Sequence, residues 1–199
     1  NIFLEKNAKV TINGQVKLSP NIYFKSNCIL NNGSSIDTGS IIDNVIVGEN
    51  TNVRAYSLIS NTLLGLNNII GPFCFIRDIC DIKDNCIVGS HVEVTRSKIF
   101  NNVKISHQSF VGDAIIGDGT IIGAGVVFCN YDGENRQISK IGTNNIIGSG
   151  SMIISPVKIG DQVIIGAGSI ISKNISNYSK IIQKRWIINA SKSISKISI

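Results

Sequence analysis

The chain has 199 residues, which is enough for one domain and too few for two large ones. Its composition is 43% hydrophobic and 16% charged with 19 glycines, which excludes a disordered chain, and its apolar residues come in short bursts that predict no membrane span. The net charge of +6 fits either a solvated basic surface or attraction of phosphate-bearing ligands, whereas the dispersed Lys and Arg residues argue against nucleic-acid binding.

A six-residue repeat runs through most of the chain. Residues 1–11 are expected to lead in from an upstream domain, and from there an aliphatic residue or Phe returns every six residues, which fits neither a helix nor a hairpin. We interpret three such hexads as one coil of a triangular prism, whose apolar positions are buried only when coils stack. The hexads begin at Ile12, Leu18, Phe24, Leu30, Ile36, Ile42, Val47, Val53, Ile59, Leu64, Ile70, Ile76, Ile82, Val88, Val94, Ile99, Ile105, Val111, Ile116, Ile122, Phe128, Ile141, Ile147, Ile153, Ile159, Ile165 and Ile171.

The repeat predicts an all-β fold. Residues 12–173 are expected to form about nine triangular coils of a left-handed parallel β-helix, and residues 174–199 a C-terminal tail. Some hexads are one residue short, and each of them is the third of its group of three: Ile42, Ile59, Val94 and Val111.

One interruption breaks the repeat. After Phe128 the spacing stops for about ten residues, over "NYDGENRQIS" at about 130–139, and it resumes at Ile141. We interpret this stretch as a loop inserted into the prism that folds over a groove or reaches a neighbouring subunit.

Four of the five cysteines fall on an inward-facing small-residue position of the hexads. Cys74, Cys80 and Cys86 are six residues apart, whereas the cysteines of zinc sites stand two to four residues apart. Core packing is therefore the favoured interpretation of these three and of Cys28, with a metal site as the alternative. No disulfide framework is indicated, and a reducing, cytoplasmic setting fits.

The register places polar residues in columns with a spacing of about 4.8 Å. The third residues of the middle hexads are small except for one histidine, which leaves an approachable backbone that suits an extended pantetheine arm. That column reads Ser90, His107, Ala124, Ser149 and Ala167. A second column, within about two coils of His107, reads Arg77, Thr95, Gly112 and Cys129.

His107 is the candidate general base. A neutral imidazole can take the proton of an amine that attacks a thioester, and an arginine such as Arg77 suits phosphate. The alternative for His107 is an ordinary surface histidine, which is also our interpretation of His91. The repeat by itself does not indicate a function, and a passive prism is the alternative interpretation.

Several motifs resemble one family. "GPFCFIRD", "VGSHVEV", "SHQSFVGDAIIGDGTIIGAG", "CNYDG" and "IGSGSMIISPVKIGDQVIIGAGS" resemble the C-terminal domain of bacterial bifunctional N-acetylglucosamine-1-phosphate uridyltransferase/glucosamine-1-phosphate acetyltransferase, in register over about 2–184. The resemblance implies acetyl transfer from acetyl-CoA to the amine of glucosamine 1-phosphate, for UDP-N-acetylglucosamine and cell-wall synthesis. It also implies a cytoplasmic homotrimer with sites between subunits. The family uses Mg²⁺ only in a separate uridyltransferase domain, so no metal is expected here.

The resemblance assigns roles residue by residue. His107 falls on the family's general base and Glu93 on its supporting acid, while Arg77 falls on a phosphate-binding arginine and Arg136 on a lysine of the acceptor site. The positions that contact coenzyme A in the family correspond to Ala124, Asn130, Tyr131, Ser149, Ala167 and Lys184.

Four positions depart from the family pattern. Thr95 stands at a phosphate-binding lysine, Phe110 at a tyrosine and Ile121 at an asparagine of the acceptor site, while Lys184 replaces an arginine near coenzyme A. Arg96 is a substitute for the missing lysine charge only if it points differently from its neighbour. The alternatives are therefore weakened binding of the same acceptor, an acyltransferase with a changed acceptor, or a nearly inactive trimerising scaffold.

Overall fold

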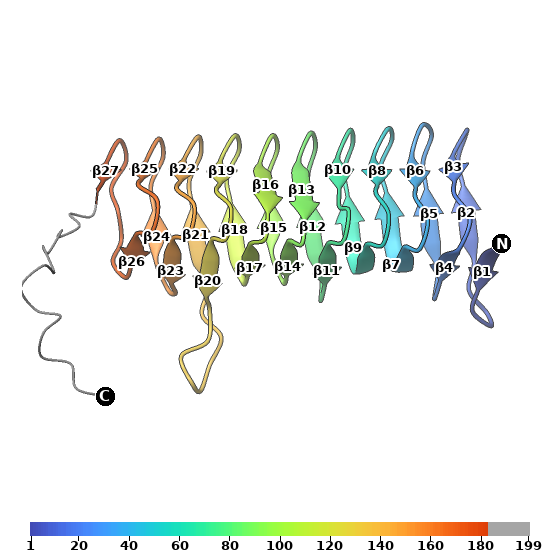
Figure 1. The fold of residues 1–199 in the computed structure, drawn as a ribbon, viewed down its shortest axis with the longest axis horizontal. Helices are drawn as coiled ribbons and strands as arrows, with labels where there is room; N and C mark the ends of the chain where they lie inside the picture. Colours follow the sequence, from blue (N-terminus) through green and yellow to red (C-terminus); the bar gives the residue numbers. More distant parts are fainter. Residues whose placement is uncertain (183–199) are drawn as a thin grey trace, which may run out of the picture.

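The computed structural model describes residues 1–182 and shows one long rod of stacked coils, with the N-terminus at one end (Figure 1). Within these residues all regular structure is β-strand, and every pairing between named strands is parallel. The chain therefore forms the left-handed parallel β-helix that the hexads predict. None of the described residues belongs to a helix with the length and hydropathy needed to cross a bilayer.

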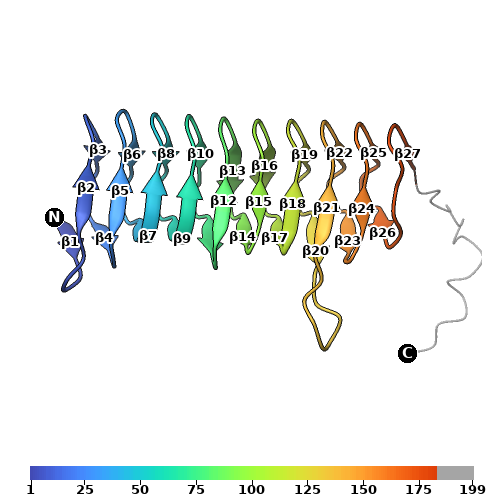
Figure 2. The ribbon, with the colours of Figure 1, turned by 180° about the vertical axis from the view of Figure 1, so that it is seen from behind.

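Each coil contributes one strand to each of three faces (Figures 1 and 2). Face 1 contains β1 (Ile2–Leu4), β4 (Ile22–Phe24), the first parts of β7 (Ile41–Val47) and β9 (Leu58–Leu64), β11 (Phe75–Arg77), β14 (Glu93–Thr95), β17 (Phe110–Gly112), β20 (Val127–Cys129), β23 (Met152–Ile154) and β26 (Ile170–Ile171). Face 2 contains β2 (Val10–Ile12), β5 (Cys28–Leu30), the ends of β7 and β9, β12 (Cys80–Ile82), β15 (Lys98–Ile99), β18 (Ala114–Ile116), β21 (Ser139–Ile141) and β24 (Lys158–Ile159). Face 3 contains β3 (Lys17–Leu18), β6 (Ser35–Ile36), β8 (Asn52–Val53), β10 (Ile69–Ile70), β13 (Ile87–Ser90), β16 (Lys104–His107), β19 (Ile121–Ile122), β22 (Ile146–Ile147), β25 (Ile164–Ile165) and β27 (Lys180–Ile181).

The hexad starts form the core. From Phe24 to Ile171 every residue at a hexad start is buried, because parallel stacking places equivalent side chains on top of one another inside the prism. The cysteines at positions 28, 74, 80 and 86 are buried in the same core. Burial raises the pKa of the Cys74 and Cys86 thiols to about 11, so these side chains are protonated packing groups at neutral pH.

The coiled part extends beyond residues 12–173 at both ends. β1 pairs with β4 before the expected start, and β27 pairs with β25 within the segment expected to be a tail. Face 3 therefore has ten strands within the described residues, against about nine expected coils. Ile175 and Ile181 keep the six-residue spacing, but a short step from Ile171 hides it in the sequence.

The corner between faces 1 and 2 explains the short hexads. Its residues Asn44, Asn61, Arg96 and Asp113 have φ between +47° and +53°. A residue in the left-handed region reverses the chain direction sharply, so a strand can turn the corner with one residue fewer. The six-residue hexad at Ile76 instead has two consecutive left-handed residues at this corner.

The corner between faces 3 and 1 changes character along the rod. Three exposed rings stack in its first half: Tyr56 on Phe73 at 5.5 Å between centroids, and Phe73 on His91 at 5.3 Å. We call these three residues the ring ladder. In the second half the same position is occupied by Gly125, Gly150 and Gly168, which we call the glycine run.

Face 1 carries an apolar stripe on its outer surface, because one outward position is apolar in nearly every coil. We call it the face 1 stripe, and its ten positions are paired strand by strand. Glu93 is its one charged member, and the others are Phe3, Tyr23, Ile41, Leu58, Phe75, Phe110, Val127, Met152 and Ile170.

Candidate functional site

A cavity of about 650 Å³ lies where the insertion leaves the corner between faces 1 and 2. Three arginines and one glutamate supply its charges, and the arginines come from three different places in the chain. The lining residues are Arg77, Arg96, Phe110, Asn130, Tyr131, Glu134, Asn135 and Arg136. The cavity therefore gathers five residues that the sequence assigned to acceptor or coenzyme A binding.

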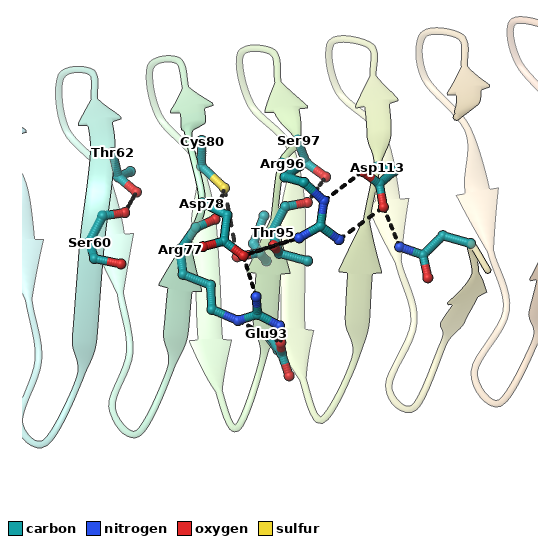
Figure 3. A network of polar contacts seen from close by, with 12 residues as sticks. Ser60, Thr62, Arg77, Asp78, Cys80, Glu93, Thr95, Arg96, Ser97 and Asp113 are labelled. Carbon is teal, nitrogen blue, oxygen red and sulfur yellow. Dashed lines mark hydrogen bonds and ion pairs between the residues drawn. The ribbon is translucent and has the colours of Figure 1, made fainter. Parts of the chain in front are cut away.

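Arg77 ends β11 and is held by two carboxylates (Figure 3). Its Nε and Nη2 donate to Oε1 of Glu93 at 3.2 and 2.7 Å, and its Nη1 donates to Asp78. The bond to Glu93 raises the pKa of Arg77 above its ordinary value, so the guanidinium is permanently charged. Glu93 thus contacts Arg77, the neighbouring cation on face 1.

Arg96 turns toward the same cavity, while Thr95 does not line it. With φ at +47°, Arg96 projects from the corner between Asp78 and Asp113 (Figure 3). Its Nε and Nη2 donate to the two carboxylate oxygens of Asp113 at 2.8 and 3.0 Å, and its Nη1 donates to Asp78 at 3.1 Å. Thr95 is fully buried and donates its hydroxyl to Asp78 at 3.2 Å.

Asp113 joins Arg96 to the insertion. It accepts hydrogen bonds from Arg96 and from the amide of Asn130, and its side chain is only 9% exposed. Burial alone raises the pKa of Asp113, but the bonds from Arg96 and Asn130 and the nearby positive charges outweigh it, so the pKa lies below its ordinary value. Asp113 is therefore ionised at neutral pH and holds two cavity residues at once.

Gly112 makes room for this arrangement. A Cβ at Gly112 would lie 2.5 Å from Nδ2 of Asn130 and 2.7 Å from the ring of Phe110. The absent side chain therefore allows the Phe110 ring and the Asn130 amide to approach the backbone at the cavity wall.

The insertion organises itself around Asp132. That carboxylate accepts from the backbone N–H groups of Asn135 and Glu134 at 2.7 and 2.9 Å and from Nε2 of Gln137 at 2.8 Å. The bonds lower the pKa of Asp132 to about 2. Tyr131 is 62% exposed, and its backbone forms an isolated antiparallel β-bridge with that of Arg136. Figure 1 shows the loop projecting away from the rod.

His107 lies at the opposite edge of face 1. It is exposed at the end of β16, beside the corner between faces 3 and 1. Backbone bonds stack its column as the register predicts: Gly125 N–H donates to His107 O at 3.2 Å, and Gly150 N–H donates to Ala124 O at 2.8 Å. The corresponding bond from Gly168 reaches Ser149 at 2.7 Å, so Ala124, Ser149 and Ala167 line one edge next to the glycine run.

The predicted residues thus form two groups on one chain. His107 precedes Gly112 by five residues, which is on the order of 15 Å of extended chain, and Gly112 is next but one to Arg77 across face 1. Within one chain His107 and Arg77 therefore lie at opposite edges of face 1, about two coils apart along the rod, as the register predicts. Ile121 is 41% exposed on the outer surface of face 3, and Lys184 lies outside the described residues.

Asp78 and Asp113 had no assigned role in the sequence interpretation, although they hold the arginines. One signal was available, because Asp113 and Arg96 are the third residues of two short hexads and so occupy one corner. Among residues 1–182, no group of three or more His, Cys, Asp or Glu side chains has an arrangement that could hold a metal ion.

A model of a known protein family matches one part of the chain. Residues 138–173 match the family model for the bacterial transferase hexapeptide of six repeats. The bifunctional protein GlmU of Rhizobium rhizogenes is 40% identical over 88 residues, and that of Chromobacterium violaceum 44% over 87 residues. Each match covers 44% of this chain and 19% of the relative, so the aligned part is about a fifth of those proteins' length. The resemblance to GlmU predicted from the sequence is confirmed.

Solved structures confirm the fold. LpxA, the UDP-N-acetylglucosamine O-acyltransferase of Moraxella catarrhalis, superposes with a TM-score of 0.58 over 82% of this chain and 70% of its own, at 20% identity. LpxA from Acinetobacter baumannii gives a TM-score of 0.53 over 90% of this chain and 68% of its own, at 18% identity.

Proposed function

We propose that this chain, a hexapeptide-repeat relative of GlmU, is an acetyltransferase that moves the acetyl group of acetyl-CoA to the amine of glucosamine 1-phosphate. The observation that carries the proposal is the cavity in which Arg77, Arg96 and Arg136 converge beside the insertion, on the face whose other edge carries His107. Guanidinium groups suit a sugar phosphate, and an exposed imidazole suits proton removal from an amine.

The reaction forms one bond and breaks one. The acceptor nitrogen attacks the thioester carbonyl, a C–N bond forms and the C–S bond breaks. His107 takes the proton that the nitrogen loses, and that proton passes to the departing thiolate to give free coenzyme A. Ala124, Ser149 and Ala167 are proposed to leave space along the corner for the pantetheine arm, and Asn130 and Tyr131 to contact coenzyme A from a neighbouring chain.

We propose a homotrimer as the active form. Two observations support it: the outward apolar face 1 stripe runs the length of the rod, and the two groups of site residues lie on opposite edges of that same face. If three copies pack through face 1 about a threefold axis, the His107 edge of one copy meets the insertion edge of the next. Burial of apolar surface of this length favours association.

On this proposal the product, N-acetylglucosamine 1-phosphate, serves UDP-N-acetylglucosamine and cell-wall synthesis in the cytoplasm. The uridylyl transfer and its Mg²⁺ belong to a separate domain. On this proposal the uridylyl transfer does not involve the residues described above.

The test is acceptor-dependent thiol release from acetyl-CoA. The proposal expects release with glucosamine 1-phosphate, linear in enzyme, and a trimer by light scattering. A trimer that binds both substrates without release would support the scaffold alternative, and a monomer with full activity would contradict the intersubunit site.

A changed acceptor is the second candidate, and Phe110 supports it because its ring lines the cavity without a hydroxyl. A panel of amino sugars and amino-sugar nucleotides at fixed acetyl-CoA distinguishes the two. This candidate requires at least one acceptor that gives faster thiol release than glucosamine 1-phosphate does.

A further inference from the structure

The charges around the cavity are arranged in two layers. The groups that line it are three arginines and one glutamate, whereas the carboxylates that bind the arginines do not line it. Asp78 and Glu93 hold Arg77, and Asp113 holds Arg96 (Figure 3). With three arginines against Glu134 the lining is therefore net positive, and Asp78, Glu93 and Asp113 orient the arginines from outside the lining.

Donor groups remain for a ligand. A guanidinium has five N–H groups. The bonds of Arg77 occupy three of its five, and those of Arg96 to Asp113, Asp78 and Thr95 occupy four. Arg136 forms no ion pair within residues 1–182, although its charge helps to lower the pKa of Asp113. A phosphate monoester offers several acceptor oxygens for such a set.

We propose that Arg96 supplies the second guanidinium for the phosphate of the acceptor, and that Asp113 is the positioning residue that sets its orientation. This deepens the proposed function and rests on it. The neutral side chain of Thr95, fully buried and bonded to Asp78, offers no charge at this place. The left-handed backbone of Arg96 instead brings a permanent charge from the next position into the cavity.

The positioning role follows from the contacts of Asp113. Its two oxygens accept both Nε and Nη2 of Arg96, which fixes the plane of the guanidinium. It also accepts the amide of Asn130, the first residue of the insertion. One carboxylate thereby ties the anion-binding arginine to the start of the loop that supplies Arg136.

Calorimetric titration of the full chain tests the proposal without requiring turnover. The ligands are glucosamine 1-phosphate and glucosamine, which differ by the phosphate. Arg96→Gln should weaken glucosamine 1-phosphate binding at least 10-fold, since a charge-assisted bond is lost, and leave glucosamine binding unchanged. Arg96→Lys keeps the charge but loses the forked guanidinium geometry, so its affinity for glucosamine 1-phosphate should lie between those of the parent and Arg96→Gln. Arg54→Gln changes an exposed arginine that follows β8 on face 3 and does not line the cavity; it is the matched control and should bind as the parent does.

Asp113→Asn separates positioning from direct binding. It should weaken glucosamine 1-phosphate binding in the parent but add little in the Arg96→Gln background, because it acts through Arg96. Unchanged phosphate affinity in Arg96→Gln, or no preference of the folded parent for the phosphate-bearing ligand, overturns the inference. Phosphate-selective binding that requires Arg96 in a chain without thiol release would retain the inference and reject the proposed function.

Discussion

The ring ladder and the glycine run occupy the same position of the repeat, at the same corner, with nearly the same backbone. φ is +57°, +55° and +55° at Tyr56, Phe73 and His91, and +67° to +69° at the three glycines. His107 stands between the two halves, one coil beyond the ladder. The coil dictates the left-handed turn, and the side chain then decides whether the backbone is covered or open.

Residues with rings at these left-handed positions strain the backbone. A non-glycine residue in the left-handed region costs on the order of 1–2 kcal/mol. Each stacked ring pair recovers about 0.5–1.5 kcal/mol. Two ring pairs return less than three left-handed residues cost, so the ladder is at best neutral for stability, whereas glycine avoids the strain and exposes backbone. The half of the corner with an open backbone is the half proposed to bind coenzyme A.

The two histidines at this corner provide the largest expected contrast. His107→Gln should lower the rate of acceptor-dependent thiol release by about 10²- to 10⁴-fold, because general-base catalysis is lost while the exposed side chain contributes nothing to packing. His91→Gln, the matched change in the ladder, should keep the parent rate. The rate at saturating substrates checks both, and equal rates for the two variants would refute the assignment of His107.

Two glycines at the corner should differ in stability. A Cβ on Gly39 (φ +72°) would lie 2.4 Å from the Tyr56 ring, whereas a Cβ on Gly150 (φ +67°) has no neighbour within 4 Å. Gly39→Ala should therefore cost about 2–3 kcal/mol from strain and overpacking, and Gly150→Ala about 1 kcal/mol from strain alone. Denaturant unfolding measures both, and equal costs would show that the ring moves away freely.

Enlarging a small side chain in the column that contains His107 should raise the KM for acetyl-CoA only on the side of the glycine run. Ala124→Leu narrows the edge next to the glycine run and should raise the KM for acetyl-CoA about 10-fold, the effect of one or two lost contacts. Ser90→Leu makes a similar change on the ladder side of His107 and should leave that KM unchanged. Initial rates at varied acetyl-CoA provide the readout. An equal rise in both variants would place the donor elsewhere.

Phe73→Asn should have the smallest effect. Asparagine tolerates a left-handed backbone, so the relief of strain offsets the two lost ring contacts, and unfolding free energy should change by less than about 1 kcal/mol. A loss above 2 kcal/mol in denaturant unfolding would show that the ladder stabilises the rod substantially.

The sequence determined much of the fold because the hexad is a local pattern with a single structural solution. The residues at the hexad starts from Phe24 to Ile171 are buried as predicted, and the insertion begins at Asn130, the residue where the interruption begins. The ends were less readable, because the strand at Ile2–Leu4 precedes the repeat and a short step after Ile171 conceals the last coil.

The candidate site also combines features that the sequence determined with features that only the structure shows. The sequence alone determined which residues share a column, since parallel stacking fixes that from spacing: Ala124 and Ser149 do stack with His107. Only the tertiary structure decided that His107 and Arg77 occupy opposite edges of face 1, and that Arg96 enters the cavity in place of Thr95. The position of Arg96 was hidden because the direction of a side chain at a corner depends on the sign of φ, which hydrophobic spacing does not encode.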